Sequence, residues 1–225
     1  VDTAHIALME NISTSVAVLL ADSKGDQILF FGEPSVIIDW RIPKVDNYKL
    51  IVITAGVPIK KACEMANAAR EAHVPFIIDP GKFIMDVAPE AIIGSIAGAD
   101  SLIMNEYEYE LLLRRTRRNY SDLFSLVSVG VITRGAKEIC VIDRTKKEEI
   151  PVVLLKDVKD PNGAGDAFLA GYAYGRYHNY SSSWAVRMGA VSASFALEAD
   201  GCQGHRFDLE HFNKRLFEQF GVLAC

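Results

Sequence analysis

The chain has 225 residues, of which 50% are hydrophobic and 24% are charged, and its formal net charge at neutral pH is −5. This composition supports an ordinary buried core in one large α/β domain or two small ones. It excludes the strongly basic surface typical of nucleic-acid-binding proteins. The closest approach to a basic cluster consists of Arg114, Arg115, Arg117 and Arg118. We interpret that cluster as a solvated helix C-terminus, where cations suit the helix dipole.

Cysteine spacing and hydropathy restrict the class of protein further. The four cysteines form no CxxC pair and no Cys/His cluster. We therefore expect reduced thiols, no transition-metal site and a cytoplasmic protein. No apolar run is long enough to cross a bilayer, so no membrane association is expected. The start at Val1 and Asp2 shows neither an initiator Met nor a signal-peptide pattern, and we expect the chain to begin inside a longer product.

The elements, taken in chain order, begin with two β-rich runs, Ser15–Ala21 and Gln27–Phe31, on either side of a turn sequence. An irregular stretch containing Pro34 and Pro43 follows. Alternating strands and helices come next, and they predict an α/β fold with a mostly parallel, doubly wound sheet flanked by helices. The predicted strands are Leu50–Thr54, Val74–Ile78, Ser101–Met104, Ser128–Thr133, Ile139–Ile142 and Ile150–Leu155. The predicted helices are Pro58–Ala72, Pro89–Ile96, Asn105–Arg115, Gly165–Arg176, Ser183–Glu198 and Leu209–Phe220.

A glycine-rich stretch before a predicted helix carries the clearest chemistry. It reads D-P-N-G-A-G-D from Asp160 to Asp166. Gly163 and Gly165 allow a tight turn and a close approach of the backbone to a ligand, and free N–H groups at a helix start bind anions. Beside a transferring phosphoryl group, the Asp166 carboxylate can take the proton of an attacking hydroxyl. The residues alone equally allow a plain loop-to-helix junction with an acid in the first turn.

This stretch resembles the C-terminal signature D-[TP]-x-G-A-G-D-x-F of the ribokinase and adenosine kinase-like (PfkB) family of carbohydrate kinases. The resemblance implies a ribokinase-like fold and ATP-dependent phosphorylation of a primary hydroxyl of a sugar or nucleoside, with Mg²⁺ bridging the phosphates. It implies that Asp166 is the catalytic base and that Gly163, Ala164 and Gly165 form the anion hole. It also places Asp160 beside a monovalent cation such as K⁺.

Three further segments fall in the order of the family's motifs. Asn105 and Glu108 resemble the N-x-x-E motif that organises magnesium and phosphate, although the same pair is also a capping box at a helix start. Thr133 and Gly135 resemble the T-x-G segment beside the nucleotide, or they belong to an ordinary hairpin. Gly201 resembles the segment whose carbonyls help to bind the monovalent cation, and it equally suits the position after a helix.

Other nucleotide-binding patterns are missing from the sequence. There is no G-x-x-x-x-G-K-[ST] loop and no H-R-D segment, which disfavours P-loop and protein-kinase mechanisms. No G-x-G-x-x-G follows the first strand, which disfavours a Rossmann-type dehydrogenase. Asp79-Pro80-Gly81 ends a predicted strand, where α/β folds place ligand loops, but we assign it no specific role.

We expect residues 1–225 to form a single ribokinase-like domain that is incomplete at its N-terminus, with residues 14–43 supplying lid strands and a connecting loop. Family members carry an upstream Gly-Gly-x-x-x-Asn motif that binds the sugar hydroxyls, and this sequence contains none. The loss of central strands would expose apolar sheet edges. We therefore expect a homodimer or pairing with the missing segment. The alternative function is a truncated, non-catalytic nucleotide-binding relative of these kinases.

Overall fold

The computed structural model describes residues 3, 16–21, 27–31, 42–54, 56–85, 87–143 and 146–221, and the chain divides into two compact units, Val1–Pro43 and Lys44–Cys225. In the first unit, β1 (Ala17–Ala21) pairs antiparallel with β2 (Gln27–Phe31), with Leu19 opposite Leu29. Both predicted strands are therefore present. The predicted turn at 22–26 and the loop at 32–41 lie outside the described residues. The role of this hairpin as a lid remains a prediction.

The second unit contains a six-stranded sheet in the order β3-β4-β5-β6-β7-β8. The first four strands run parallel: β3 (Ile51–Ile53), β4 (Phe76–Ile78), β5 (Ser101–Asn105) and β6 (Val129–Thr133). The last two strands are β7 (Ile139–Asp143) and β8 (Lys147–Ile150). β7 pairs antiparallel with β6, and β8 pairs antiparallel with β7. The predicted α/β class with a mostly parallel sheet is confirmed.

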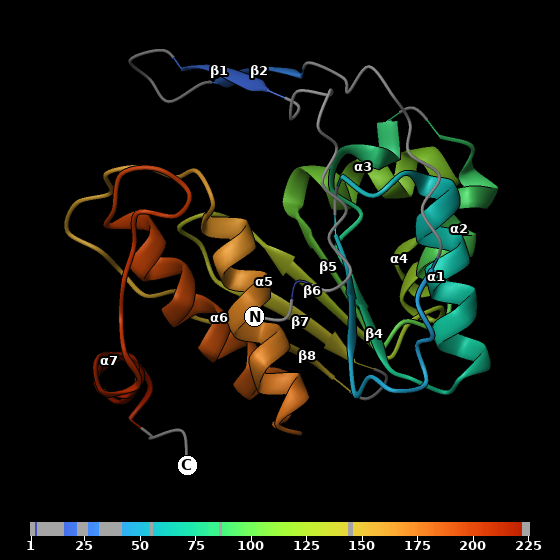
Figure 1. Cartoon of the computed structure of the whole chain (residues 1–225). Helices are drawn as coiled ribbons and strands as arrows, with labels where there is room; N and C mark the ends of the chain where they lie inside the picture. Colours follow the sequence, from blue (N-terminus) through green and yellow to red (C-terminus); the bar gives the residue numbers. More distant parts are fainter. Residues whose placement is uncertain are drawn as a thin grey trace. The chain divides into compact units, whose positions relative to one another are not determined.

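Helices cover both faces of this sheet (Figure 1). On one side lie α5 (Ala164–Tyr177) and α6 (Ser182–Leu197), with α7 (Leu209–Phe220) packed against α6. On the other side lie α1 (Ile59–Glu71), α2 (Pro89–Ile96), α3 (Glu106–Thr116) and α4 (Tyr120–Phe124). Among the helices of the described residues, none is both long and apolar enough to span a membrane.

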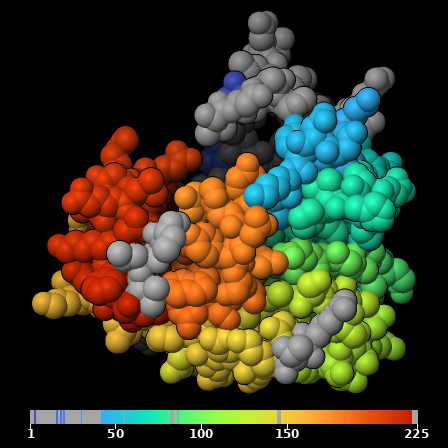
Figure 2. All heavy atoms as spheres, turned by 90° about the horizontal axis from the view of Figure 1, so that it is seen from below, coloured from blue at the N-terminus to red at the C-terminus, as the bar shows by residue number. Residues whose placement is uncertain are grey.

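Small residues let α5 and α6 pack closely. A Cβ added at Gly171 would lie 2.7 Å from the carbonyl oxygen of Met188, so a larger residue there would push the two helices apart. Phe168 and Tyr172 of α5 pack in one core with strand residues that include Ile103 and Val131. In the space-filling view, the orange surface of these two helices lies between the red C-terminal residues and the cyan residues near β3 and α1 (Figure 2).

A buried polar chain fixes α5 on β5. Ser101 Oγ donates to Asp100 Oδ2 at 2.8 Å, so the Tyr172 hydroxyl, 2.7 Å away, donates to Ser101 Oγ. Arg176 completes the chain with two hydrogen bonds to the Asp100 carboxylate, at 2.7 and 3.1 Å. Burial raises the pKa of Tyr172, which keeps its hydroxyl neutral and able to donate. This chain sets the position of α5, the helix whose first turn carries Asp166.

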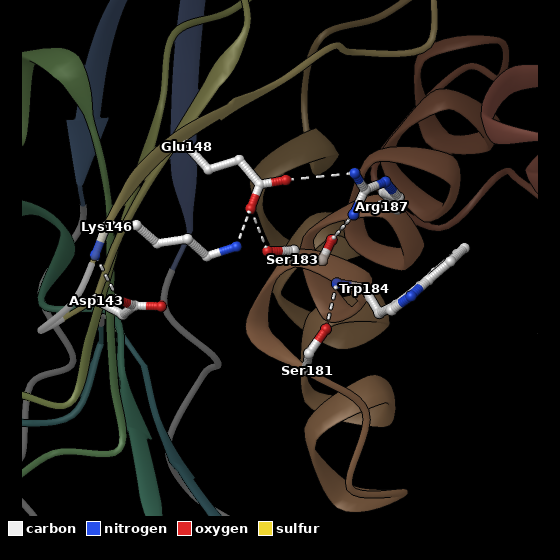
Figure 3. A network of polar contacts seen from close by, with 7 residues as sticks. All are labelled: Asp143, Lys146, Glu148, Ser181, Ser183, Trp184 and Arg187. Carbon is white, nitrogen blue, oxygen red and sulfur yellow. Dashed lines mark hydrogen bonds and ion pairs between the residues drawn. The ribbon is translucent and has the colours of Figure 1, made fainter.

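A second polar network holds β8 against α6 (Figure 3). Glu148 Oε2 accepts hydrogen bonds from Lys146 Nζ at 2.7 Å and from Oγ of the buried Ser183 at 2.6 Å. Glu148 Oε1 lies 3.4 Å from Arg187 Nη2. The hydrogen bonds from Lys146 and Ser183 lower the pKa of Glu148 because they favour its charged form.

Two kinds of difference separate the predicted elements from the observed ones. The strand predicted at Ile150–Leu155 ends at its first residue, because Ile150 pairs with Ile139, where β7 begins, and Pro151 has no N–H to extend the ladder. The five-residue 3-10 helix at Gly81–Met85 and the five-residue α4 were not predicted. Both are too short to show a helical period in the sequence.

Candidate functional site

Three polar residues follow parallel strands at the same edge of the sheet. Asp79 comes directly after β4, Asn105 ends β5, and Thr133 ends β6 as the register partner of Asn105. The residues two positions earlier on these strands all pack in the core shared with α5 and α6 (Ile77, Ile103 and Val131). Because side chains alternate along a strand, the three polar residues point toward the α5 side of the sheet. In α/β folds, ligands bind at this carboxyl edge.

The start of α5 depends on Gly163. This N-cap residue has φ +79°, and a Cβ placed on it would lie 2.9 Å from Cα of Cys202. Both the left-handed backbone and the close approach require glycine. Within the described part of the chain, the amides of Gly165 and Asp166 donate to no acceptor. The helix start therefore presents two unsatisfied N–H donors at the positive end of the helix dipole, as an anion site needs.

Asp166 is the third residue of α5, and it is exposed. Among the described residues, no group donates a hydrogen bond to its carboxylate, so both of its oxygens are open to a ligand. The neighbouring Gly165 borders open space, because a Cβ added there would meet no protein atom within 4 Å. A carboxylate, two amide donors and room for a ligand thus occur together in one helical turn.

Asp160 connects the glycine-rich loop to the segment after α6. Its Oδ1 accepts hydrogen bonds from the backbone N–H and the side-chain amide of Asn162, at 2.9 and 2.7 Å, and its Oδ2 accepts from the N–H of Gly201 at 3.0 Å. These bonds lower the pKa of Asp160, the N–H of Asn162 contributing most. The two residues predicted to lie beside a monovalent cation are therefore in direct contact.

Asn105 and Glu108 form a complete capping box at the start of α3. Asn105 Oδ1 accepts from the N–H of Glu108, and Glu108 Oε2 accepts from the N–H of Asn105, both at 2.9 Å. The capping interpretation of this pair is thus confirmed. The geometry is compatible with the magnesium and phosphate role as well, because carboxylate and amide oxygens can each accept more than one interaction.

A cavity of about 510 Å³ lies beside this edge. Five of the predicted site residues line it: Asn105, Thr133, Gly135, Ala164 and Gly165. The rest of its lining is largely apolar and comes from the 152–158 segment and from α5 and α6, with Val152, Leu154, Val158, Ala193 and Leu197 among the residues. The cavity therefore has a polar end at the helix start and an apolar end suited to an uncharged group.

The apolar wall of this cavity was missed by the sequence analysis, which interpreted residues up to Leu155 as a strand. Leu154 is 78% exposed and Val158 is 56% exposed. Exposed apolar side chains that border a cavity suit the binding of an apolar ligand group. A signal was present in the sequence, because Pro151 precedes this apolar run and weakens its assignment as a strand.

The segment between β6 and β7 is a hairpin, as one of the two interpretations predicted, and it also borders the cavity. Arg134 does not enter the cavity from it. Its Nε donates to the carbonyl of Glu138 at 2.8 Å, and its Nη2 lies 3.2 Å from Glu149. Thr133 and Gly135, on either side, line the cavity. The Arg134 side chain therefore lies outside the cavity lining.

Asp79 is a site residue to which the sequence analysis assigned no role. Its Oδ1 accepts from the N–H of Gly81 at 3.0 Å. Burial, followed by the charge of Glu108 and, less strongly, that of Asp166, raises the pKa of Asp79 to about 6, although the Gly81 hydrogen bond opposes the shift. Strongly perturbed acids cluster at functional sites. Asp79 therefore belongs to the same electrostatic environment as the predicted base.

The acids at this edge do not form a closed metal centre. Within the described residues, no group of three or more His, Cys, Asp or Glu side chains could hold a metal ion. Mg²⁺ is commonly bound through one or two carboxylates together with waters and substrate phosphates. The donor set of Asn105 and Glu108 fits that mode of binding, in which the nucleotide supplies most of the ligands.

Comparison with known proteins decides the family. The sequence model of the pfkB family of carbohydrate kinases matches residues 1–206. The chain belongs to this family. Among curated relatives, it is 28% identical to a nucleoside kinase of Methanocaldococcus jannaschii over 90% of this chain and 67% of that protein. It is 24% identical to a ribokinase of Lactococcus lactis over 82% of this chain and 59% of that protein.

Solved structures agree with this assignment. The nucleoside kinase of Burkholderia thailandensis in complex with inosine matches with a TM-score of 0.85 at 26% identity, over 95% of this chain and 72% of that one. The M. jannaschii nucleoside kinase matches with a TM-score of 0.81 at 25% identity, over 93% of this chain and 70% of that one. This PfkB chain therefore has the ribokinase-like fold and spans about 60–70% of the length of the relatives it matches. The two curated relatives are thus a nucleoside kinase and a ribokinase.

Proposed function

We propose that this protein transfers the γ-phosphoryl group of ATP to a primary hydroxyl of a nucleoside or sugar. The observation that carries the proposal is the first turn of α5, where unsatisfied amides and the Asp166 carboxylate border open space beside a cavity of about 510 Å³. The apolar end of the cavity suits the base of the donor nucleotide, and the polar end suits its phosphates. The structure of the B. thailandensis relative in complex with ADP-inosine supports the choice of donor.

The proposed chemistry uses the residues of the chain directly. The Asp166 carboxylate accepts the proton of the acceptor hydroxyl while the hydroxyl oxygen attacks the γ-phosphorus. The bond from that phosphorus to the bridging oxygen of ADP breaks, and ADP leaves with the bonding electrons. The N–H groups of Gly165 and Asp166 stabilise the charge on the phosphoryl oxygens. Gly163 sets the direction of these donors by closing the turn before them.

Two ions complete the proposal. Mg²⁺, held with the nucleotide near Asn105 and Glu108 through water, would neutralise phosphate charge. A monovalent cation such as K⁺ would lie beside Asp160 and the carbonyls near Gly201. The hydrogen bond from the N–H of Gly201 to the Asp160 carboxylate already joins these two loops. Oδ2 of Asp160 accepts only the hydrogen bond from Gly201 and keeps a further lone-pair site, so the carboxylate can hold the loop and contact a cation at once.

A nucleoside is the first acceptor class to test. The matching nucleoside kinases include a curated relative at 28% identity and two solved structures at 25–26% identity. The L. lactis ribokinase is 24% identical and the Arabidopsis thaliana ribokinase structure 21%. The proposed experiment is an ADP-release assay with ATP over a panel of nucleosides and sugars, with and without K⁺. We expect release with at least one nucleoside.

The same assay distinguishes the alternative function. If the protein binds ATP but releases no ADP with any acceptor, whether it is assayed as this chain alone or as part of a longer product, it is a non-catalytic nucleotide-binding relative.

We also propose that β3, an end strand of the six-stranded sheet, pairs with a second copy or with a further segment. Its Val52 side chain is 37% exposed. Sedimentation showing only soluble, monodisperse monomer would count against this pairing.

A further inference from the structure

A second cavity, of about 470 Å³, lies away from the donor cavity at the far end of α3. It is lined by the end of α3 and the start of α2: Arg114, Arg115, Thr116, Arg117, Pro89 and Glu90. α3 begins beside the candidate site, and its 11 residues span about 16 Å at 1.5 Å per residue. The two cavities share no lining residue.

The arginines of this cavity have no acidic partners. Across the described ranges, none of the three forms an ion pair. Arg115 donates from Nη2 to the carbonyl of Val87 at 2.7 Å, while its buried Nε has no acceptor. Arginines at a helix C-terminus need no ligand when they simply point into water. Here all three arginines line a cavity.

The start of α2 adds a second source of positive potential. Its N-cap residue, Ala88, provides no side-chain hydrogen bond, and Pro89 at the first position has no N–H. The N–H of Glu90 donates to no acceptor in the part of the chain that the structure describes. The dipole of α2 and this amide therefore favour an anion on the cavity side. Among the described residues that line the cavity, only Glu90 carries a carboxylate that opposes it.

We propose that this cavity binds the phosphate group of a small phosphorylated metabolite. Guanidinium groups recognise phosphate oxygens through paired, charge-assisted hydrogen bonds. The volume of about 470 Å³ lies within the range of small-molecule sites and exceeds the need of a bare phosphate ion. The proposal is independent of the reaction assigned to the donor cavity, because it rests on different residues.

The test is a calorimetric titration of the full chain, saturated with ADP, with ribose 5-phosphate and with inorganic phosphate at low ionic strength. We expect the double variant Arg114→Ala/Arg117→Ala to bind ribose 5-phosphate at least about tenfold more weakly. The matched control, Lys60→Ala/Lys214→Ala, removes two exposed positive charges elsewhere and should change the affinity less than about twofold. Inorganic phosphate should bind more weakly than ribose 5-phosphate.

The Glu90→Gln variant should change the affinity in the opposite direction. It removes the one negative charge of the cavity and should tighten binding by about two- to fivefold, an effect that partial unfolding cannot imitate. Equal weakening by the arginine and lysine pairs would overturn the proposal, as would unchanged affinity in the arginine variant or in Glu90→Gln. Equal affinity for the two ligands would contradict a metabolite site and leave a free phosphate site instead.

Discussion

Asp79 provides the sharpest test of the electrostatics at the candidate site. Its pKa is raised from 3.8 to about 6, mainly by burial and then by the charge of Glu108. The folded chain therefore binds a proton at Asp79 more tightly than the unfolded chain does. In the absence of ligands, the contribution of Asp79 to stability is fully present below about pH 4 and is lost as the pH rises through about 6.

The size of this loss follows from the shift. A difference of about two pKa units corresponds to about 3 kcal/mol at 1.4 kcal/mol per unit, which is an upper value because the site relaxes when the charge forms. Asp79→Asn keeps an oxygen that can accept the N–H of Gly81, so the turn after β4 is retained. At pH 8 the variant should be more stable than the wild type by about 1–3 kcal/mol.

The assay is urea unfolding of both proteins between pH 4.5 and 8. The difference between their free energies of unfolding isolates Asp79, because the other groups titrate in both. It should already be about a third of its full value at pH 4.5, because the carboxyl of the unfolded chain ionises from about pH 4, and it should reach its full value by about pH 7. An exposed acid away from the site, in Asp46→Asn, is the matched control. Parallel profiles for wild type and Asp79→Asn would refute the raised pKa.

Three further outcomes follow from the site and its support. Gly163→Ala should destabilise the fold by about 2 kcal/mol or more in urea unfolding, because it forces φ +79° on an alanine and places Cβ 2.9 Å from Cys202 Cα. Gly165→Ala should leave stability nearly unchanged yet weaken ATP binding in a calorimetric titration, because its Cβ meets only open space; unchanged affinity would argue against an anion site there. Glu148→Gln should cost about 1 kcal/mol at pH 7, and this difference should shrink as the pH falls through the lowered pKa of Glu148; an undiminished difference near pH 3 would contradict the charged network.

The sequence was sufficient to predict the elements with strong periodicity or strong end signals. α2 and α7 have the predicted bounds, and α5 extends one residue beyond its predicted bounds at each end. The capping box of Asn105 and Glu108 was also predictable, because it depends on residues three positions apart. These features are local, so a few neighbouring side chains decide them.

Other features depended on contacts between distant residues. The hydrogen bond between Asp160 and Gly201 joins residues that are 41 positions apart. The raised pKa of Asp79 depends on burial beneath neighbouring elements and on Glu108, which lies in the first turn of α3. No periodicity or spacing contains that information. The apolar wall at Leu154 and Val158 was missed for a different reason, because an irregular segment that borders a ligand cavity has the composition of a strand.

The role of Asp166 is the central claim, and it is tested most directly by Asp166→Asn. The assay is ADP release with the best nucleoside or sugar acceptor, together with a calorimetric titration of ATP. Asparagine keeps the size of the side chain but cannot accept the proton of the acceptor. We predict a fall in kcat of about a thousandfold, with ATP affinity within about threefold of the wild type. Turnover close to the wild-type rate would contradict the assignment of Asp166 as the base.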